Sequence, residues 1–111
     1  MNVNTITLDE FKKMLSSEQN VVIVDVLDAE HYRKEHLKSA ISIPLDELRD
    51  KAPKILKKTN KIITYCGSFD CPASTKAAKV LMSLGYEHVF DYKGGFKEYK
   101  DAGLPLEGEA I

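Results

Sequence analysis

The sequence predicts an α/β domain built on a central, mostly parallel, five-stranded sheet with helices on both faces. The first indication is VVIVDV at residues 21–26, an almost unbroken β-branched run typical of parallel strands buried on both faces. The second is the order of segments, because strand-like and helix-like patterns alternate along the whole chain. The 111 residues suffice for one hydrophobic core, so we assign residues 1–111 to one domain.

The composition is that of an ordinary globular protein, with 43% apolar residues, 30% charged residues and a net charge of −1. So small a net charge does not favour binding to nucleic acid or to an acidic membrane surface. No apolar run approaches the roughly 20 residues that span a bilayer, and no signal peptide is visible. Two cysteines in such a chain fit a reducing compartment. We therefore expect a cytoplasmic protein and, by default, a monomer.

The first elements are a short extended segment and a helix that begins after Thr7. Thr7 and Glu10 have the spacing of a capping box, in which each side chain bonds the backbone N–H of the other residue. Four apolar residues then follow at helical spacing: Leu8, Phe11, Met14 and Leu15. The strand at 21–26 comes next, and then a short polar helix within 28–37.

The remaining two thirds of the chain continue the same alternation. A third strand at 40–44 should stop at Pro44, and Pro53 should kink or divide the helix that follows over 45–58. The later elements are a fourth strand at 61–66, a helix at 73–85, a fifth strand at 88–92, a closing helix at 94–103 and a tail at 104–111. Gly85 suits the position just past the end of a helix.

Cys66 ends the fourth predicted strand and directly precedes a loop and a helix, the place where ligands bind in open α/β sheets. Gly67 permits a tight turn, and Pro72 suits the first turn of the next helix. Backbone N–H groups and a helix N-terminus would then converge on the thiol and acidify it. Cys66 is therefore a candidate nucleophile, and the alternatives are a small buried residue or one half of a pair with Cys71.

Several motifs, taken in order, resemble the rhodanese-like (sulfurtransferase) domain family. One is VVIVDVLDAEHYRKEHLKSAISIP at residues 21–44, which is similar to the family's strand-Asp-Val, Gly-His-Ile and Ala-Ile-Asn-Ile-Pro segment. The other runs from IITYCGSFDCPAS at 62–74 through the Ala-Ala helix and the Gly-Gly pair to AGLP at 102–105. The resemblance covers nearly the whole chain and implies the rhodanese-like fold.

The resemblance implies that Cys66 takes sulfane sulfur from a small donor, carries it as a persulfide and passes it to a thiol or to cyanide. It also implies no cofactor and no metal. The substrate-binding group would be the loop amides after Cys66, with the Ser68 hydroxyl as a further donor: Gly67, Ser68, Phe69, Asp70 and Cys71. Asp25 and His36 match structural positions of the family, Asp25 beneath the loop and His36 before the third strand.

Three positions depart from the family pattern. Leu27 replaces the Arg that usually pairs with the strand-end aspartate, so we expect Asp25 to find backbone donors. Glu35 replaces the Gly that usually precedes the histidine. The loop contains no basic residue, and its one charged residue is Asp70, which would repel a dianion. We therefore expect persulfide or polysulfide to be a better donor than thiosulfate.

The sequence also separates rival functions. Related phosphatases need an Arg six residues after the cysteine, where this chain has Pro72, so phosphatase activity is not expected. Cys71 is either an inert residue near the start of the next helix or a resolving thiol for Cys66. The remaining alternatives are a dithiol redox switch and a non-catalytic sulfur-relay or protein-interaction module. A metal site is disfavoured, because Cys66 and Cys71 supply only two ligands.

Overall fold

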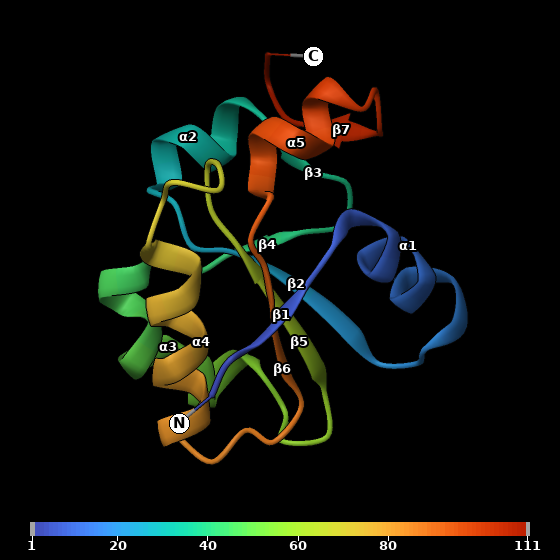
Figure 1. Ribbon diagram of the computed structural model, residues 1–111. Helices are drawn as coiled ribbons and strands as arrows, with labels where there is room; N and C mark the ends of the chain where they lie inside the picture. Colours follow the sequence, from blue (N-terminus) through green and yellow to red (C-terminus); the bar gives the residue numbers. More distant parts are fainter. Residues whose placement is uncertain (1, 111) are drawn as a thin grey trace.

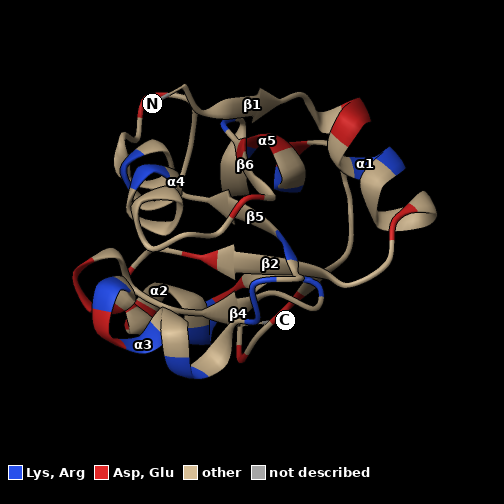
Figure 2. Cartoon of the chain, turned by 90° about the horizontal axis from the view of Figure 1, so that it is seen from below, with Lys and Arg blue, Asp and Glu red and all other residues tan. Residues whose placement is uncertain are grey.

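The computed structural model describes residues 2–110 and contains a five-stranded sheet in which all neighbouring strands are parallel. Figure 2 shows the strands side by side. In spatial order they are β1 (Asn4–Ile6), β6 (Val89–Tyr92), β5 (Lys61–Tyr65), β2 (Val21–Asp25) and β4 (Ile41–Ser42). The sequence therefore predicted the α/β class and the five parallel strands correctly. β5 lies at the centre, so Cys66 follows a strand with neighbours on both sides.

Helices cover both faces of the sheet, as expected (Figure 1). One face carries α1 (Leu8–Ser17) and α5 (Gly95–Asp101), and the other carries η1 (Leu45–Glu47), α3 (Leu48–Ile55) and α4 (Ala73–Ser83). The short helix α2 (Ala29–Lys34) lies near the carboxyl end of β2.

The strand residues supply two separate hydrophobic cores, because successive side chains point to opposite faces of a sheet. Ile63 of β5 packs with Phe11 and Tyr99 of the α1–α5 face, whereas its neighbour Ile62 packs with Leu81 of the α3–α4 face. This explains why the central strands are apolar at consecutive positions. No helix within residues 2–110 is long and apolar enough to cross a membrane.

The structure confirms the predicted signals at the start of α1 and at the end of α4. The Thr7 hydroxyl accepts a hydrogen bond from the Glu10 N–H at 3.1 Å, and the Glu10 carboxylate accepts one from the Thr7 N–H at 2.9 Å. This confirms the capping box at the start of α1. Gly85 follows the end of α4 with φ of +95°, a left-handed conformation that glycine adopts without strain.

The expected division of a helix at Pro53 was wrong. The predicted helix at 45–58 divides between η1 and α3, at Glu47 and Leu48, whereas Pro53 lies inside α3. Pro53 is tolerated there because it falls in the last turn of a short helix, where only one backbone bond is lost. The tail, for which no element was predicted, contains β7 (Leu106–Glu107), which pairs antiparallel with β3 (His36–Leu37).

Candidate active site

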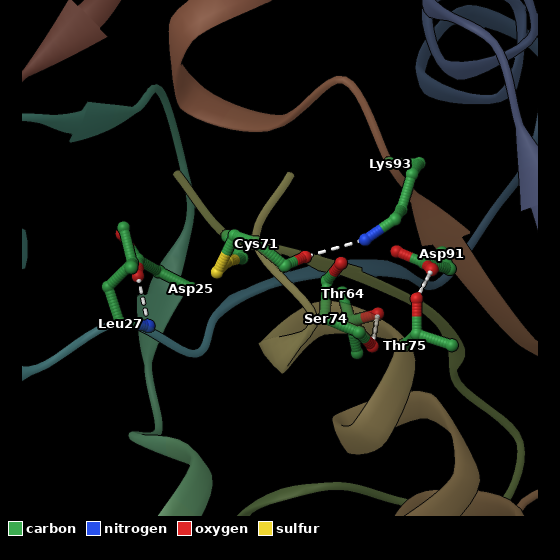
Figure 3. The surroundings of a disulfide bond; sticks show 9 residues. Asp25, Leu27, Thr64, Cys71, Ser74, Thr75, Asp91 and Lys93 are labelled. Atoms are coloured by element: carbon green, nitrogen blue, oxygen red, sulfur yellow. Dashed lines mark hydrogen bonds between the residues drawn. A yellow bond between two sulfur atoms is a disulfide. The ribbon is translucent and has the colours of Figure 1, made fainter. Parts of the chain in front are cut away.

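Cys66 lies at the carboxyl end of β5 and is almost completely buried, with 1% of its surface exposed. Its side chain is joined to Cys71 by a disulfide, across a Cα–Cα distance of 6.2 Å. Figure 3 shows this bond above the start of α4. We call residues 66–72 the Cys66 loop. The structure thus brings the two cysteines of the sequence together at the strand end.

The start of α5 holds the Cys66 loop through its carbonyl groups. The N–H of Phe96 donates to the Cys66 carbonyl oxygen at 2.8 Å, and the N–H of Lys97 donates to the Gly67 carbonyl oxygen at 2.8 Å. In a trans peptide the next N–H points opposite to the carbonyl. The N–H groups of Gly67 and Ser68 are therefore turned away from α5.

The glycine pair before α5 makes this close approach sterically feasible. Gly95 has φ of +65°, and a Cβ atom built there would lie 2.4 Å from the Cys66 carbonyl oxygen. Any other residue would push the loop away from the helix. Gly95 therefore lies in direct contact with the Cys66 loop.

The loop offers backbone donors for an anion or a persulfide. Within residues 2–110, the N–H groups of Gly67, Ser68, Phe69 and Asp70 have no hydrogen-bond acceptor. The Cys71 N–H differs from the expectation, because it donates to the Ser68 carbonyl oxygen at 3.1 Å and closes a turn. The available amides therefore run from Gly67 to Asp70 and stop before Cys71.

Two basic side chains lie near the loop, Lys93 from the segment between β6 and α5 and Lys97 from α5, and the sequence analysis did not indicate them. Lys93 donates from Nζ to the Cys71 carbonyl oxygen at 2.5 Å (Figure 3). Lys97 lines a hollow of about 260 Å³ beside Ser68 and Phe69, and its amine pairs with Asp101 at 2.9 Å. Both amines are thus already engaged by groups of the chain.

Phe69 and Asp70 form the exposed tip of the loop. Phe69 keeps 59% of its surface exposed, an unusual state for a large apolar side chain. It borders the hollow beside Lys97 and a second hollow on the β1 side that Thr7 and Leu8 help to line. Asp70 is exposed as well.

Asp25 is fully buried at the end of β2, and both of its oxygens are hydrogen-bonded. Oδ1 accepts from the Leu27 N–H at 2.9 Å. A backbone donor was expected here, because Leu27 stands where the family pattern has an arginine. Oδ2 accepts from the Tyr65 hydroxyl at 2.6 Å. Burial raises the pKa of Asp25 above its usual value, and the bonds from Tyr65 and Leu27 oppose that shift.

Tyr65 was missed at the sequence level, although it directly precedes Cys66. Its hydroxyl accepts from the Leu37 N–H at 3.1 Å while donating to Asp25, so it links β5, β2 and β3. Burial, followed by the charge of Asp25, raises the pKa of Tyr65 far above its usual value. The available signal was a tyrosine next to the end of a predicted strand, since a buried hydroxyl requires a hydrogen-bond partner.

His36 lies beside α2 in the small β3–β7 sheet. Its Nδ1 lies 2.6 Å from the Tyr32 carbonyl oxygen, and its ring stacks on Tyr32 with centroids 3.7 Å apart. Glu35 has φ of −154°, an extended conformation that needs no glycine, and it pairs with Lys100 at 2.8 Å. The local turn is therefore compatible with the substitution at residue 35.

A second set of hydrogen-bonded polar residues lies behind the loop and connects β5, β6 and α4. The sequence analysis did not identify it. The Thr64 hydroxyl donates to the Ser74 carbonyl oxygen at 2.9 Å, and the Thr75 hydroxyl donates to Asp91 Oδ2 at 2.6 Å (Figure 3). These bonds fix the first turn of α4 against the sheet. In residues 2–110, no group of three or more His, Cys, Asp or Glu side chains is arranged to hold a metal ion.

The fold and the site define an α/β domain with a cysteine-containing loop between the central parallel strand and a helix. The rhodanese-like domain pattern matches residues 7–102. The chain therefore belongs to the rhodanese-like domain family, as the ordered motifs indicated. A crystal structure of a Bacillus halodurans protein is 30% identical, with a TM-score of 0.88, and the match covers 96% of this chain and 78% of that one.

Other similar proteins include an Escherichia coli rhodanese solved with anions, which is 31% identical with a TM-score of 0.64 over 80% of this chain and 99% of that one. The tRNA uridine(34) hydroxylase of Erwinia tasmaniensis is 33% identical over 87% of this chain and 29% of its own length. The putative sulfur carrier protein YrkF of Bacillus subtilis is 28% identical over 88% of this chain and 51% of its own length. The chain thus spans about a third to a half of these curated relatives.

Proposed function

We propose that this domain is a sulfurtransferase in which Cys66 carries sulfane sulfur as a persulfide. The observation that carries the proposal is the position of Cys66 at the end of β5, in a loop whose carbonyls bond α5 and whose amides from Gly67 to Asp70 have no acceptor within residues 2–110. Such amides stabilise negative charge on a persulfide or on a departing thiolate. Membership of the rhodanese-like family supports the same chemistry.

The donor we favour is a persulfide or a polysulfide rather than thiosulfate. The two lysines near the loop are both shared with groups of the chain, Lys93 with the Cys71 carbonyl and Lys97 with Asp101, which weakens their attraction for a thiosulfate dianion. Asp70 adds a negative charge at the exposed tip of the loop. The acceptor is a thiol or cyanide.

A relay to another protein is the second candidate, and the similarity to a putative sulfur carrier favours it. In that case the acceptor thiol belongs to a partner, and turnover with small molecules is slow. Under both candidates the domain acts as a monomer in the cytoplasm, where cellular thiols keep Cys66 reduced between cycles.

Intact-mass spectrometry on reduced protein tests the proposal directly. The wild type, Cys66→Ser and Cys71→Ser are incubated separately with glutathione persulfide, polysulfide and thiosulfate. Cys71→Ser should gain the mass of one sulfur atom from the first two donors and little from thiosulfate, and Cys66→Ser should gain none. Equal loading of Cys66→Ser, or loading by thiosulfate alone, would overturn the proposal.

A further inference from the structure

The two cysteines differ sharply in accessibility, although their sulfur atoms are bonded to each other. Cys66 is 1% exposed and belongs to the core beside α4, whereas Cys71 is half-buried at the edge of that core. The turn from the Cys71 N–H to the Ser68 carbonyl and the bond from Lys93 to the Cys71 carbonyl fix the backbone of Cys71 on both sides. Cys71 is therefore held in place next to the buried thiol.

We infer that Cys71 resolves the Cys66 persulfide by attacking its inner sulfur, so that the domain releases the carried sulfur as hydrogen sulfide. The inference rests on the proposed persulfide at Cys66 and names a further activity of the same site, persulfide reduction. It uses three features of the structure: the Cys66–Cys71 bond, the burial of Cys66 and the partial exposure of Cys71.

The step balances without an external oxidant. The Cys71 thiolate forms a bond to Cys66 Sγ, the bond between Sγ and the outer sulfur breaks, and the outer sulfur leaves as hydrosulfide. The proton lost by the Cys71 thiol is taken up by hydrosulfide, which gives H₂S. The sulfane sulfur gains two electrons, and the two cysteines lose two electrons as they become the disulfide.

The geometry favours the inner sulfur over the outer one. The bond in the structure joins Cys71 Sγ to Cys66 Sγ itself, which is the product of attack on the inner sulfur. If Cys71 attacked the outer sulfur instead, that sulfur would be transferred to Cys71. Cys71 Sγ would then have to lie one sulfur atom farther from Cys66 Sγ than it does in the disulfide. A persulfide on a residue as buried as Cys66 is also poorly placed for a large external acceptor, whereas Cys71 is adjacent.

The disulfide must be reopened by a dithiol reductant, either a small molecule or a protein. Such a reductant reaches the half-buried Cys71 more easily than the almost completely buried Cys66, so it forms its mixed disulfide on Cys71. Cys66 then leaves as a thiolate, and the unpaired amides that begin at Gly67 stabilise it. Each cycle consumes one persulfide and one dithiol and produces one H₂S.

The first test measures sulfide and intact mass after reduced, oxygen-free protein receives one equivalent of glutathione persulfide. The wild type should release about one equivalent of sulfide and lose the mass of two hydrogens, at least about tenfold faster than Cys71→Ser, because the attacking thiol is intramolecular. Cys71→Ser and Cys71→Ala should both retain one added sulfur, and Cys66→Ser sets the background. Cys71→Ala, which has no hydroxyl, controls for an effect of the serine hydroxyl in Cys71→Ser.

The outcomes separate the two proposals. If Cys71→Ser and Cys71→Ala gain no sulfur although both remain folded by circular dichroism, the proposed persulfide on Cys66 fails. If they gain sulfur but the wild type keeps it too and releases no sulfide, the persulfide stands and only the resolving role fails. Added sulfur mapped to Cys71 in the wild type, or a disulfide formed without matching sulfide, as in a simple redox switch, would also overturn the resolving role.

A second test locates the attack by the reductant. The oxidised wild-type protein is treated with a coloured aromatic monothiol, quenched in acid and mapped by peptide mass spectrometry. The adduct is expected on Cys71 with Cys66 free. An adduct mainly on Cys66 would contradict the assigned direction of reduction.

Discussion

The backbone N–H of Phe96 donates a 2.8 Å hydrogen bond to the carbonyl oxygen of Cys66, so the last helix of the chain holds the loop that carries the candidate nucleophile. The two residues lie 30 positions apart in the sequence and meet because β5 and β6 are neighbours in the sheet. This contact depends on the absence of a side chain at Gly95. We therefore expect a change at this contact to affect both the stability of the fold and the proposed reactivity of Cys66.

Gly95→Ala should impair both properties. Its Cβ would lie 2.4 Å from the Cys66 carbonyl oxygen at a φ of +65°, so the loop must move. Gly103→Ala is the matched control, because its φ is +74° but nothing lies within 4 Å of the added Cβ. We expect a loss of about 1 kcal/mol of unfolding free energy for Gly103→Ala and about 3 kcal/mol for Gly95→Ala by urea denaturation. Only Gly95→Ala should slow persulfide loading, and equal loading rates would contradict this interpretation.

Tyr65→Phe should destabilise the fold by about 2 to 3 kcal/mol, because it leaves one oxygen of the buried Asp25 carboxyl without its 2.6 Å donor. Tyr86→Phe is the control, since it also removes one buried hydroxyl, but that hydroxyl bonds only neutral backbone carbonyls. We expect a loss near 1 kcal/mol for the control. Chemical denaturation of both variants measures the difference, and a larger loss for Tyr86→Phe would be the contrary result.

The contribution of Asp25 to stability should depend on pH in a defined direction. Burial raises the pKa of Asp25 in the folded state above 3.8, so the folded protein binds this proton more readily than the unfolded chain does. The stability contributed by the protonated form is complete below the unfolded pKa and is lost as pH rises through the raised pKa. The unfolding free energy of the wild type minus that of Asp25→Asn should therefore fall across this window and then level off. Denaturant titrations at a series of pH values measure it, and a difference that rises with pH would show the opposite sign.

Thr75→Val should cost about 2 to 3 kcal/mol of unfolding free energy, because Asp91 is fully buried and the Thr75 hydroxyl is its donor at 2.6 Å. Within residues 2–110 the other Asp91 oxygen has no partner. Adding Asp91→Val should recover part of the loss, since the unpaired carboxyl is then gone. Thr5→Val on the exposed side of β1 is the control and should change stability by less than about 0.5 kcal/mol. Strict additivity in the double variant would count against a direct interaction.

The features that sequence reasoning predicted correctly are those set by neighbouring residues. The capping box of Thr7 and Glu10 spans three positions, and the turn at Gly85 depends on one residue. The β-branched run of β2 signals its own burial. Each signal acts within one turn of helix or one strand, so the order of elements follows from the chain alone.

The features that were missed or wrong depend on residues far apart in the sequence. β3 and β7 contain two residues each and pair His36 with Glu107, too short a pattern for hydrophobic periodicity to detect. The partner of Asp25 is Tyr65, 40 positions away. Pro53, expected to kink or divide a helix, is a local exception, since the break lies at Glu47, where the chain first forms a 3₁₀ turn after Pro44.

The sequence by itself determined the α/β class, the parallel sheet, the family and the place of Cys66 at a strand end, because each follows from local patterns and their order. Only the tertiary structure decided the environment of Cys66. Its bond to Cys71, the hydrogen bonds from α5 to the loop and the orientation of the Gly67 and Ser68 amides require the end of β5, the Cys66 loop and the start of α5 to meet. Sequence patterns specify which residues prefer to be buried, whereas the packing of the sheet and helices specifies which of them touch.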